Sequence, residues 1–140
     1  MKKRNVLFVM SSLRNGGAER SLVNLLQLLD YDRYNVDLLL FQNEGMFLKQ
    51  VPKEVNIISN CNKLYTLYDN NKAEALKHPY LSAVHMIGTF ISRKKTNSVA
   101  KSRQYRWEHF YKKIVPELTK EYDVAIAYMQ REQTYFLVDK

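Results

Sequence analysis

A glycine-rich turn near the N-terminus carries the residue types that bind phosphate groups. It runs from Asn15 to Arg20 with the sequence NGGAER, and it joins an apolar run to a helical pattern. Glycines let a phosphate approach the backbone, and the free N–H groups at the start of a helix bind its negative charge. A purely structural role is the alternative, because a tight turn needs glycine for its backbone angles alone.

Glu19 and Arg20 follow the two glycines within the first turn of the expected helix. The helix dipole favours a carboxylate at that position, which gives Glu19 a structural explanation. In a functional interpretation Glu19 contacts a sugar hydroxyl, and Arg20 offsets its charge beside a phosphate. The motif is not a dinucleotide fingerprint or a P-loop, because it lacks the third spaced glycine and the Gly-Lys-Ser/Thr sequence.

Positive charge is concentrated in one stretch of the chain. Between Ile91 and Lys113 there are eight basic residues and one acid, a net charge of +7 out of +8 for the whole chain. A localised patch of this kind indicates an anionic partner more than a uniformly basic surface does. The candidate anion-binding residues are Arg93, Lys94, Lys95, Lys101, Arg103 and Arg106.

Three interpretations of this basic stretch stay open. It is a solvated helix face with its aromatic residues Tyr105, Trp107, Phe110 and Tyr111 in the core, a surface that docks on an anionic membrane, or a nucleic-acid site. Nucleic acid is not expected as a partner, because the sequence contains no recognisable reading element.

Metal and disulfide chemistry have little support in the sequence. The histidines His78, His85 and His109 show no metal-ligand spacing, and Cys61 is the only cysteine. One cysteine excludes an intramolecular disulfide and a clustered-cysteine zinc site, and it fits a reducing cytosol. We therefore expect no metal and no other cofactor.

The elements that must position the glycine turn follow from the apolar runs. Short apolar runs alternate with helical patterns, which predicts an α/β fold of the Rossmann-like type, with a mainly parallel sheet and helices on both faces. The expected strands are Val6–Met10, Val36–Phe41, Val55–Ser59 and Val124–Tyr128. The glycine turn then lies at the C-terminal edge of the first strand, where parallel sheets bind ligands.

Several helices are expected between and after these strands. One runs from Ala18 to about Leu29, and another opens at Pro79 with an apolar stripe through Leu81, Val84, Ile87 and Ile91. A third covers Trp107 to Leu118 and is kinked or split at Pro116, and Thr134 is expected to cap a last helix. No run approaches the roughly 20 apolar residues that span a bilayer.

Three segments resemble one enzyme family. The segment NVLFVMSSLRNGGAERSLVNLLQLL resembles the start of bacterial family-4 (group 1) retaining glycosyltransferases, and GGAER at Gly16 to Arg20 is its most specific element. The segments VDLLLFQNEGMF and YDVAIAYMQ are similar to the second strand and a later strand of that family. The resemblance covers most of the chain, and the section from Lys63 to Ser98 is not diagnostic.

The resemblance implies a GT-B fold, in which two Rossmann-like domains face each other across a cleft. Residues 1–140 would be an incomplete N-terminal, acceptor-side domain, with the donor-binding domain and its paired glutamates absent from the chain. The donor-sugar histidine of the family normally follows a strand beyond Lys140. Gly16 and Gly17 would bind the donor diphosphate, and Glu19 and Arg20 would contact the acceptor or support the loop. No catalytic residue is assigned.

The implied reaction moves a sugar from a nucleoside-diphosphate donor to a glycan or lipid-linked acceptor in bacterial surface polysaccharide synthesis. The enzyme would be cytoplasmic, peripheral on the inner face of the membrane, and inactive as this fragment alone. Two alternatives remain. One is a sugar-nucleotide epimerase of related architecture, and the other is a non-catalytic basic module that binds a membrane surface or nucleic acid.

Overall fold

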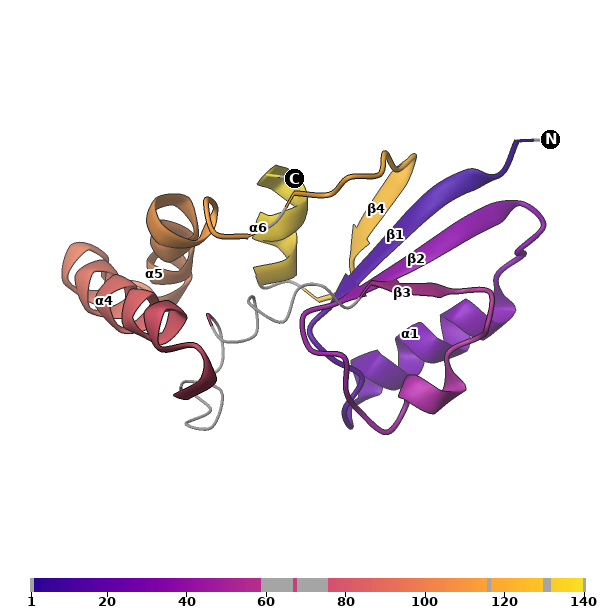
Figure 1. Ribbon diagram of the computed structural model, residues 1–140, viewed down its shortest axis with the longest axis horizontal. Coiled ribbons are helices and arrows are strands. Elements are labelled where there is room, and N and C mark those ends of the chain that lie inside the picture. Colours follow the sequence, from indigo (N-terminus) through magenta and orange to yellow (C-terminus); the bar gives the residue numbers. More distant parts are fainter. Residues whose placement is uncertain (1, 59–66, 68–75, 116, 130–131, 140) are drawn as a thin grey trace.

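Four parallel strands form one sheet in the order β3-β2-β1-β4 (Figure 1). The computed structural model describes residues 2–58, 67, 76–115, 117–129 and 132–139. The strands are β1 (Arg4–Met10), β2 (Tyr34–Leu40), β3 (Asn56–Ile58) and β4 (Val124–Ala127). All four predicted strands are confirmed, each with somewhat different ends.

The central strand β1 is buried on both faces, as its unbroken apolar sequence predicts. Phe8 and Met10 face helix α1 (Gly17–Leu28), which packs on them through Leu22, Val23 and Leu26. The alternate residues of β1 face a second core on the other side of the sheet. A short 3-10 turn, η1 (Leu48–Gln50), leads from β2 toward β3.

The second core is closed by chain segments from the C-terminal half. Helix α6 (Glu132–Asp139) contributes Phe136, and a π-helical turn, η2 (Trp107–Tyr111), contributes its first and last residues. The Trp107 indole N–H donates a hydrogen bond to Asp139, which joins the two elements. Helices therefore lie on both faces of the sheet, as predicted.

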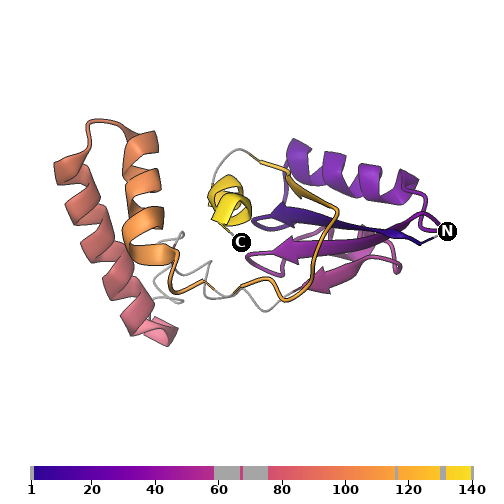
Figure 2. The same ribbon diagram turned by 90° about the horizontal axis from the view of Figure 1, so that it is seen from above.

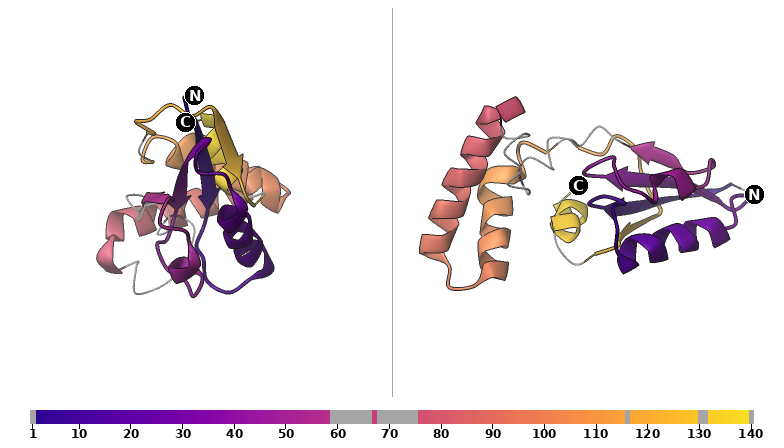
Figure 3. Two further views of the ribbon diagram at one scale, coloured as in Figure 1. Left: turned by 90° about the vertical axis from the view of Figure 1, so that its right-hand side faces the viewer. Right: turned by 90° about the horizontal axis from the view of Figure 1, so that it is seen from below.

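Helices α4 (Pro79–Lys95) and α5 (Val99–Arg106) pack side by side beyond the edge at which the strands end (Figure 2). The hydroxyls of Ser92 and Ser102 are 2.7 Å apart in the buried contact between them. The pair projects away from the sheet and from α1 (Figure 3). Among the described residues, no helix is long and apolar enough to cross a bilayer.

Two helix predictions were wrong. Helix α5 already begins at Val99, and the helical chain ends at Tyr111, so residues 117–123 carry no helix where the sequence suggested one through Leu118. The kink or split expected at Pro116 lies outside the described residues, and Val115 just before it is not helical, as the restriction that proline places on the preceding residue predicts. Thr134 lies inside α6 and does not cap it.

Two burial expectations also failed. Ile87 belongs to the apolar stripe that was expected to face the core, yet its side chain is 55% exposed. The apolar run at Val124–Tyr128 is typical of a buried strand, but β4 lies at an edge of the sheet, and Val124 is exposed.

Gly88 allows the close approach between α4 and the turn that follows α5. A methyl group at this position would lie 3.4 Å from the Phe110 ring and 3.7 Å from Arg106 Cγ, which is ordinary contact. We expect Gly88→Ala to raise the free energy of unfolding by about 0.5–1 kcal/mol, because alanine is the better helix former. Gly88→Leu should lower it by about 1–3 kcal/mol through overpacking. Urea denaturation of both variants tests this, and equal effects would contradict the packing.

Candidate functional site

The C-terminal edge of the sheet contains the point at which the chain reverses direction across the strands. From β1 the chain proceeds outward through β2 to β3, and it later returns to pair β4 with the other side of β1. Open parallel sheets bind ligands in the crevice at such a switch point. The loop after β1 and the chain after β4 lie at this end of the sheet, and the first of them contains the predicted glycine turn.

The two glycines lie where the sequence placed them, at the start of α1. Gly16 has extended backbone angles and precedes the helix, and its carbonyl accepts the first helical hydrogen bond from the Arg20 N–H at 3.1 Å. Gly17 is the first helical residue, and a side chain added to it would meet no atom within 4 Å. The space on the Cβ side of Gly17 is therefore open.

Glu19 and Arg20 have different surroundings. A methyl group at Gly16 would overlap the Glu19 carboxylate, so that carboxylate lies over the Gly16 backbone. This placement agrees with the structural explanation, in which the carboxylate sits in the positive field at the helix start. Arg20 is exposed on the outside of the first turn.

The loop after β2 holds the glycine turn in place. The Leu13 N–H donates to the Glu44 carbonyl at 2.9 Å, and the Leu13 carbonyl accepts from the Phe47 N–H at 3.2 Å. The Arg14 guanidinium adds an ion pair with the Glu44 side chain, although both groups are about half exposed and such a pair contributes little. The backbone pairing is what fixes the position of the turn.

Gly45 makes this backbone pairing possible, and its role was not predicted from the sequence. Its φ of +132° is a conformation that side chains rarely adopt, and a methyl group there would overlap the carbonyl of Leu13. An isolated glycine shortly after an apolar strand was the available signal, since such glycines mark close backbone approach.

A buried amide lies on the other side of β1 at the same edge. Gln133 of α6 is fully buried, and its side-chain N–H donates to the hydroxyl of Ser11, the first residue after β1. Within the part of the chain that the structure describes, the amide oxygen of Gln133 has no hydrogen-bond partner. Across the sheet, the Tyr128 hydroxyl lies 2.8 Å from that of Ser21 in α1 and so ties the chain after β4 to the helix.

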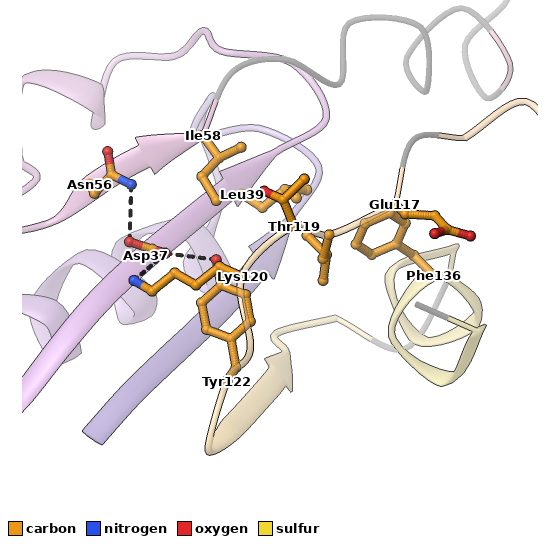
Figure 4. Close-up of a pocket in the computed structure, with 10 residues that line it drawn as sticks. Asp37, Leu39, Asn56, Ile58, Glu117, Thr119, Lys120, Tyr122 and Phe136 are labelled. Carbon is orange, nitrogen blue, oxygen red and sulfur yellow. Dashed lines mark hydrogen bonds and ion pairs between the residues drawn. The ribbon is translucent and has the colours of Figure 1, made fainter. Parts of the chain in front are cut away.

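A buried carboxylate interrupts the apolar face opposite α1. Asp37 of β2 is only 3% exposed and accepts three hydrogen bonds, from Asn56 at 3.0 Å, Lys120 at 2.9 Å and Tyr122 at 2.7 Å (Figure 4). Asn56 is its register neighbour in β3, and the other two come from the segment that covers this face. The carboxylate thus anchors the irregular segment before β4 to the sheet.

The pKa values of this network indicate a structural role. Burial raises the pKa of Asp37, but the hydrogen bonds from Tyr122, Lys120 and Asn56 outweigh it and hold the pKa below its usual value. Burial and the neighbouring carboxylate raise the pKa of Tyr122. A general acid or base needs a pKa near the working pH, so neither group is suited to proton transfer at neutral pH.

A cavity of about 440 Å³ lies beside the network, between β2, β3 and the covering segment. Its size suits a small ligand, and its walls combine apolar and polar groups. The lining residues are Asp37, Leu39, Asn56, Ile58, Glu117, Leu118, Thr119, Lys120, Tyr122 and Phe136 (Figure 4).

The predicted anion-binding residues are not brought to the glycine turn. They lie on α4 and α5, where Arg93, Lys94, Lys95 and Lys101 are exposed. Arg103 and Arg106 are half-buried, which corrects the expectation of one continuous basic surface. Arg106 turns inward because it bonds the Ser102 hydroxyl at 3.2 Å.

The structural interpretation placed four aromatic residues near these cations in the core, and it holds for two of them, whereas Tyr105 and Phe110 are half-buried. Trp107 and Tyr111 are buried in the core. No group of three or more metal-ligating side chains occurs in the part of the chain that the structure describes. Cys61 lies outside the described residues.

Comparisons with protein-family models, curated proteins and solved structures give no match to this chain.

We expect Gly45→Ala to lower the free energy of unfolding by about 1–3 kcal/mol, because alanine is strained at this φ and overlaps Leu13. The amide NMR signals of Gly16 and Gly17 should shift as the turn moves. Gly17→Ala is the matched control for the change in stability, because its methyl group meets open space. Urea denaturation and amide spectra test the expectation, and an undisturbed turn in Gly45→Ala would contradict it.

Tyr122→Phe should lower the free energy of unfolding by about 1.5–3 kcal/mol, because it removes a hydrogen bond to a buried carboxylate. Tyr34→Phe is the control, because the Tyr34 hydroxyl makes no hydrogen bond among the described residues.

The ionised Asp37 also makes stability depend on pH. Since the folded pKa of Asp37 is lowered, its contribution to the free energy of unfolding is full above the unfolded pKa of about 3.9 and is lost as pH falls below it. Asp37→Asn should flatten that acid limb in denaturation measured against pH, and an unchanged limb would refute the assignment.

Proposed function

We propose that this chain is the acceptor-side, N-terminal domain of a retaining glycosyltransferase. The enzyme that contains it moves a sugar from a nucleoside-diphosphate donor to a glycan or lipid-linked acceptor in bacterial surface polysaccharide synthesis. One observation carries the proposal: the GGAER motif opens helix α1 at the switch-point edge of a parallel sheet, with Gly17 unobstructed.

Gly16 and Gly17 are the residues that we place at the donor diphosphate, and the open space at Gly17 supports this role more directly than the surroundings of Gly16, where the Glu19 carboxylate lies. The first N–H groups of α1 lack partners within the helix, and the helix dipole favours an anion there. The paired loop after β2 holds these groups in position before a ligand binds, which lowers the cost of ordering them. The diphosphate needs no metal ion in this arrangement, because the backbone amides supply the positive field.

Glu19 fits the acceptor side better than the donor side. Its carboxylate lies over Gly16, where it would repel a phosphate that approached the same backbone directly. A neutral sugar hydroxyl is a compatible partner for it. Arg20 is exposed in the next position and supplies the compensating charge.

We place the reaction at the cytoplasmic face of the membrane, because lipid-linked acceptors are found there.

Replacing Gly17 with valine tests the assignment in the enzyme that contains this domain. The side chain enters open space, so stability should change by less than about 0.5 kcal/mol. The kcat/KM for transfer should fall about 100-fold, because the donor is displaced from its reacting position. Gly17→Ala should give a smaller loss. Unchanged kinetics in both variants would return the turn to a structural role.

The isolated chain provides a second measurement of the same site. Titration with a panel of nucleoside-diphosphate sugars should shift the Gly16 and Gly17 amide signals only weakly, because one glycine turn offers few contacts. Micromolar affinity in calorimetry would contradict the claim that the main donor contacts lie outside this domain. Analysis of the products made by the complete enzyme separates sugar transfer from the epimerase alternative.

A further inference from the structure

Helix α4 presents an apolar stripe to solvent. Tyr80, Ala83, Ile87 and Phe90 follow one another at helical spacing, and all four side chains are exposed. Met86 lies beside them. The exposed fractions of Tyr80, Met86, Ile87 and Phe90 lie between 55% and 70%. The opposite, buried face of the helix holds Leu81, Gly88 and Ser92. The outer face thus carries large apolar side chains as well as the inner one, and an exposed apolar face of this kind marks an interaction site.

The stripe leads directly into positive charge. Arg93, Lys94 and Lys95 form the exposed last turn of α4, and Lys101 adds a cation on α5. Helices α4 and α5 contain no acidic residue. The ammonium group of Lys94 lies 4.5 Å from the centre of the Phe90 ring, so the charged and apolar parts form one continuous surface.

The position of this surface leaves room for a large partner. Helices α4 and α5 project beyond the edge at which the strands end, away from α1 and the sheet (Figures 2 and 3). The glycine turn lies at that same edge of the sheet.

We propose that the α4–α5 pair docks on an anionic lipid surface, with the apolar stripe inserted among the acyl chains and the cations at the headgroups. An apolar face flanked by lysine and arginine, without acids, is the composition of helices that lie in a membrane interface. Long basic side chains bury their stems and keep their charges at the headgroups. The inserted residues are thus Tyr80, Met86, Ile87 and Phe90, and not the aromatic residues of the basic stretch.

Other covers fit the surface less well. A second copy of this chain would bring two sets of cations together on a protein of net charge +8. Nucleic acid would pair with the cations but would leave the aliphatic side chains Met86 and Ile87 without a partner. The inference stands apart from the proposed sugar transfer, because lipid binding is measured without donor or acceptor.

Sedimentation with vesicles tests the proposal on the full chain. One set of vesicles contains phosphatidylcholine and phosphatidylglycerol in equal parts, and the other contains phosphatidylcholine alone. We expect binding to the anionic vesicles and little to the neutral ones. It should weaken as salt rises from about 0.1 M to about 1 M, since the Debye length falls from about 10 Å to about 3 Å.

Paired variants separate the apolar part from the charged part. Ile87→Ser with Phe90→Ser should weaken binding to anionic vesicles at least about tenfold, because two inserted side chains are lost. Arg93→Ala with Lys94→Ala should weaken it about 25-fold, since each charge near anionic lipid is worth about fivefold. The matched controls are Leu28→Ser on α1 and Lys49→Ala with Lys53→Ala, all exposed and distant, and these should bind as the parent does.

Any of the following results would overturn the proposal. Equal binding to neutral and anionic vesicles, or none to either, would remove the anionic membrane as partner. Full binding by the serine variant would leave adhesion by charge alone, without insertion. Displacement from vesicles by a short duplex DNA at equal charge would favour nucleic acid, and self-association abolished by the serine variant would identify a second copy as the cover. Circular dichroism confirms that each variant is folded.

Discussion

Burial of β1 on both faces is the constraint from which the arrangement of the other elements follows. Its alternate side chains belong to two separate cores, and each core needs its own covering layer because exposed apolar surface is costly. Helix α1 is adjacent in sequence and covers one face directly. The other face is closed from far along the chain, by Trp107, Tyr111 and Phe136. The C-terminal half is therefore organised by contacts that local sequence does not reveal.

The two layers that cover the sheet differ in the polar groups that they bury. The α1 face is closed by regular helical packing, whereas the opposite face includes Asp37 and an irregular covering segment. A segment without secondary structure needs other partners for its ends, and a buried carboxylate with three donors provides a fixed point. Removing one donor would leave the charge partly unsatisfied, which is why such networks stabilise only as complete sets. The cavity beside Asp37 is the space that an irregular cover leaves unfilled.

Signals that are local in sequence predicted the structure well. The apolar runs located the strands, and the glycine pair located the start of α1 to within one residue. Partners distant in sequence were not accessible in this way: no local signal pairs Asp37 with Tyr122, and an isolated glycine at position 45 does not say which segment it approaches. The stripe through Ile87 shows a different limit, because periodicity reveals that a helix has an apolar face but not which surface covers it.

Within the described residues, the two edge strands are much shorter than the inner ones, with three residues in β3 and four in β4 against seven in each of β1 and β2. Short edges offer few unpaired backbone groups to a neighbouring molecule, which protects a sheet against aggregation. The start of β4 is held by Asp123, whose carboxylate accepts from the Asn5 N–H at 2.7 Å while its own N–H donates to the Asn5 carbonyl. If β4 detached, β1 would become a long apolar edge, the kind of segment that seeds cross-β assembly. Colloidal stability of the protein thus depends on a strand of only four residues.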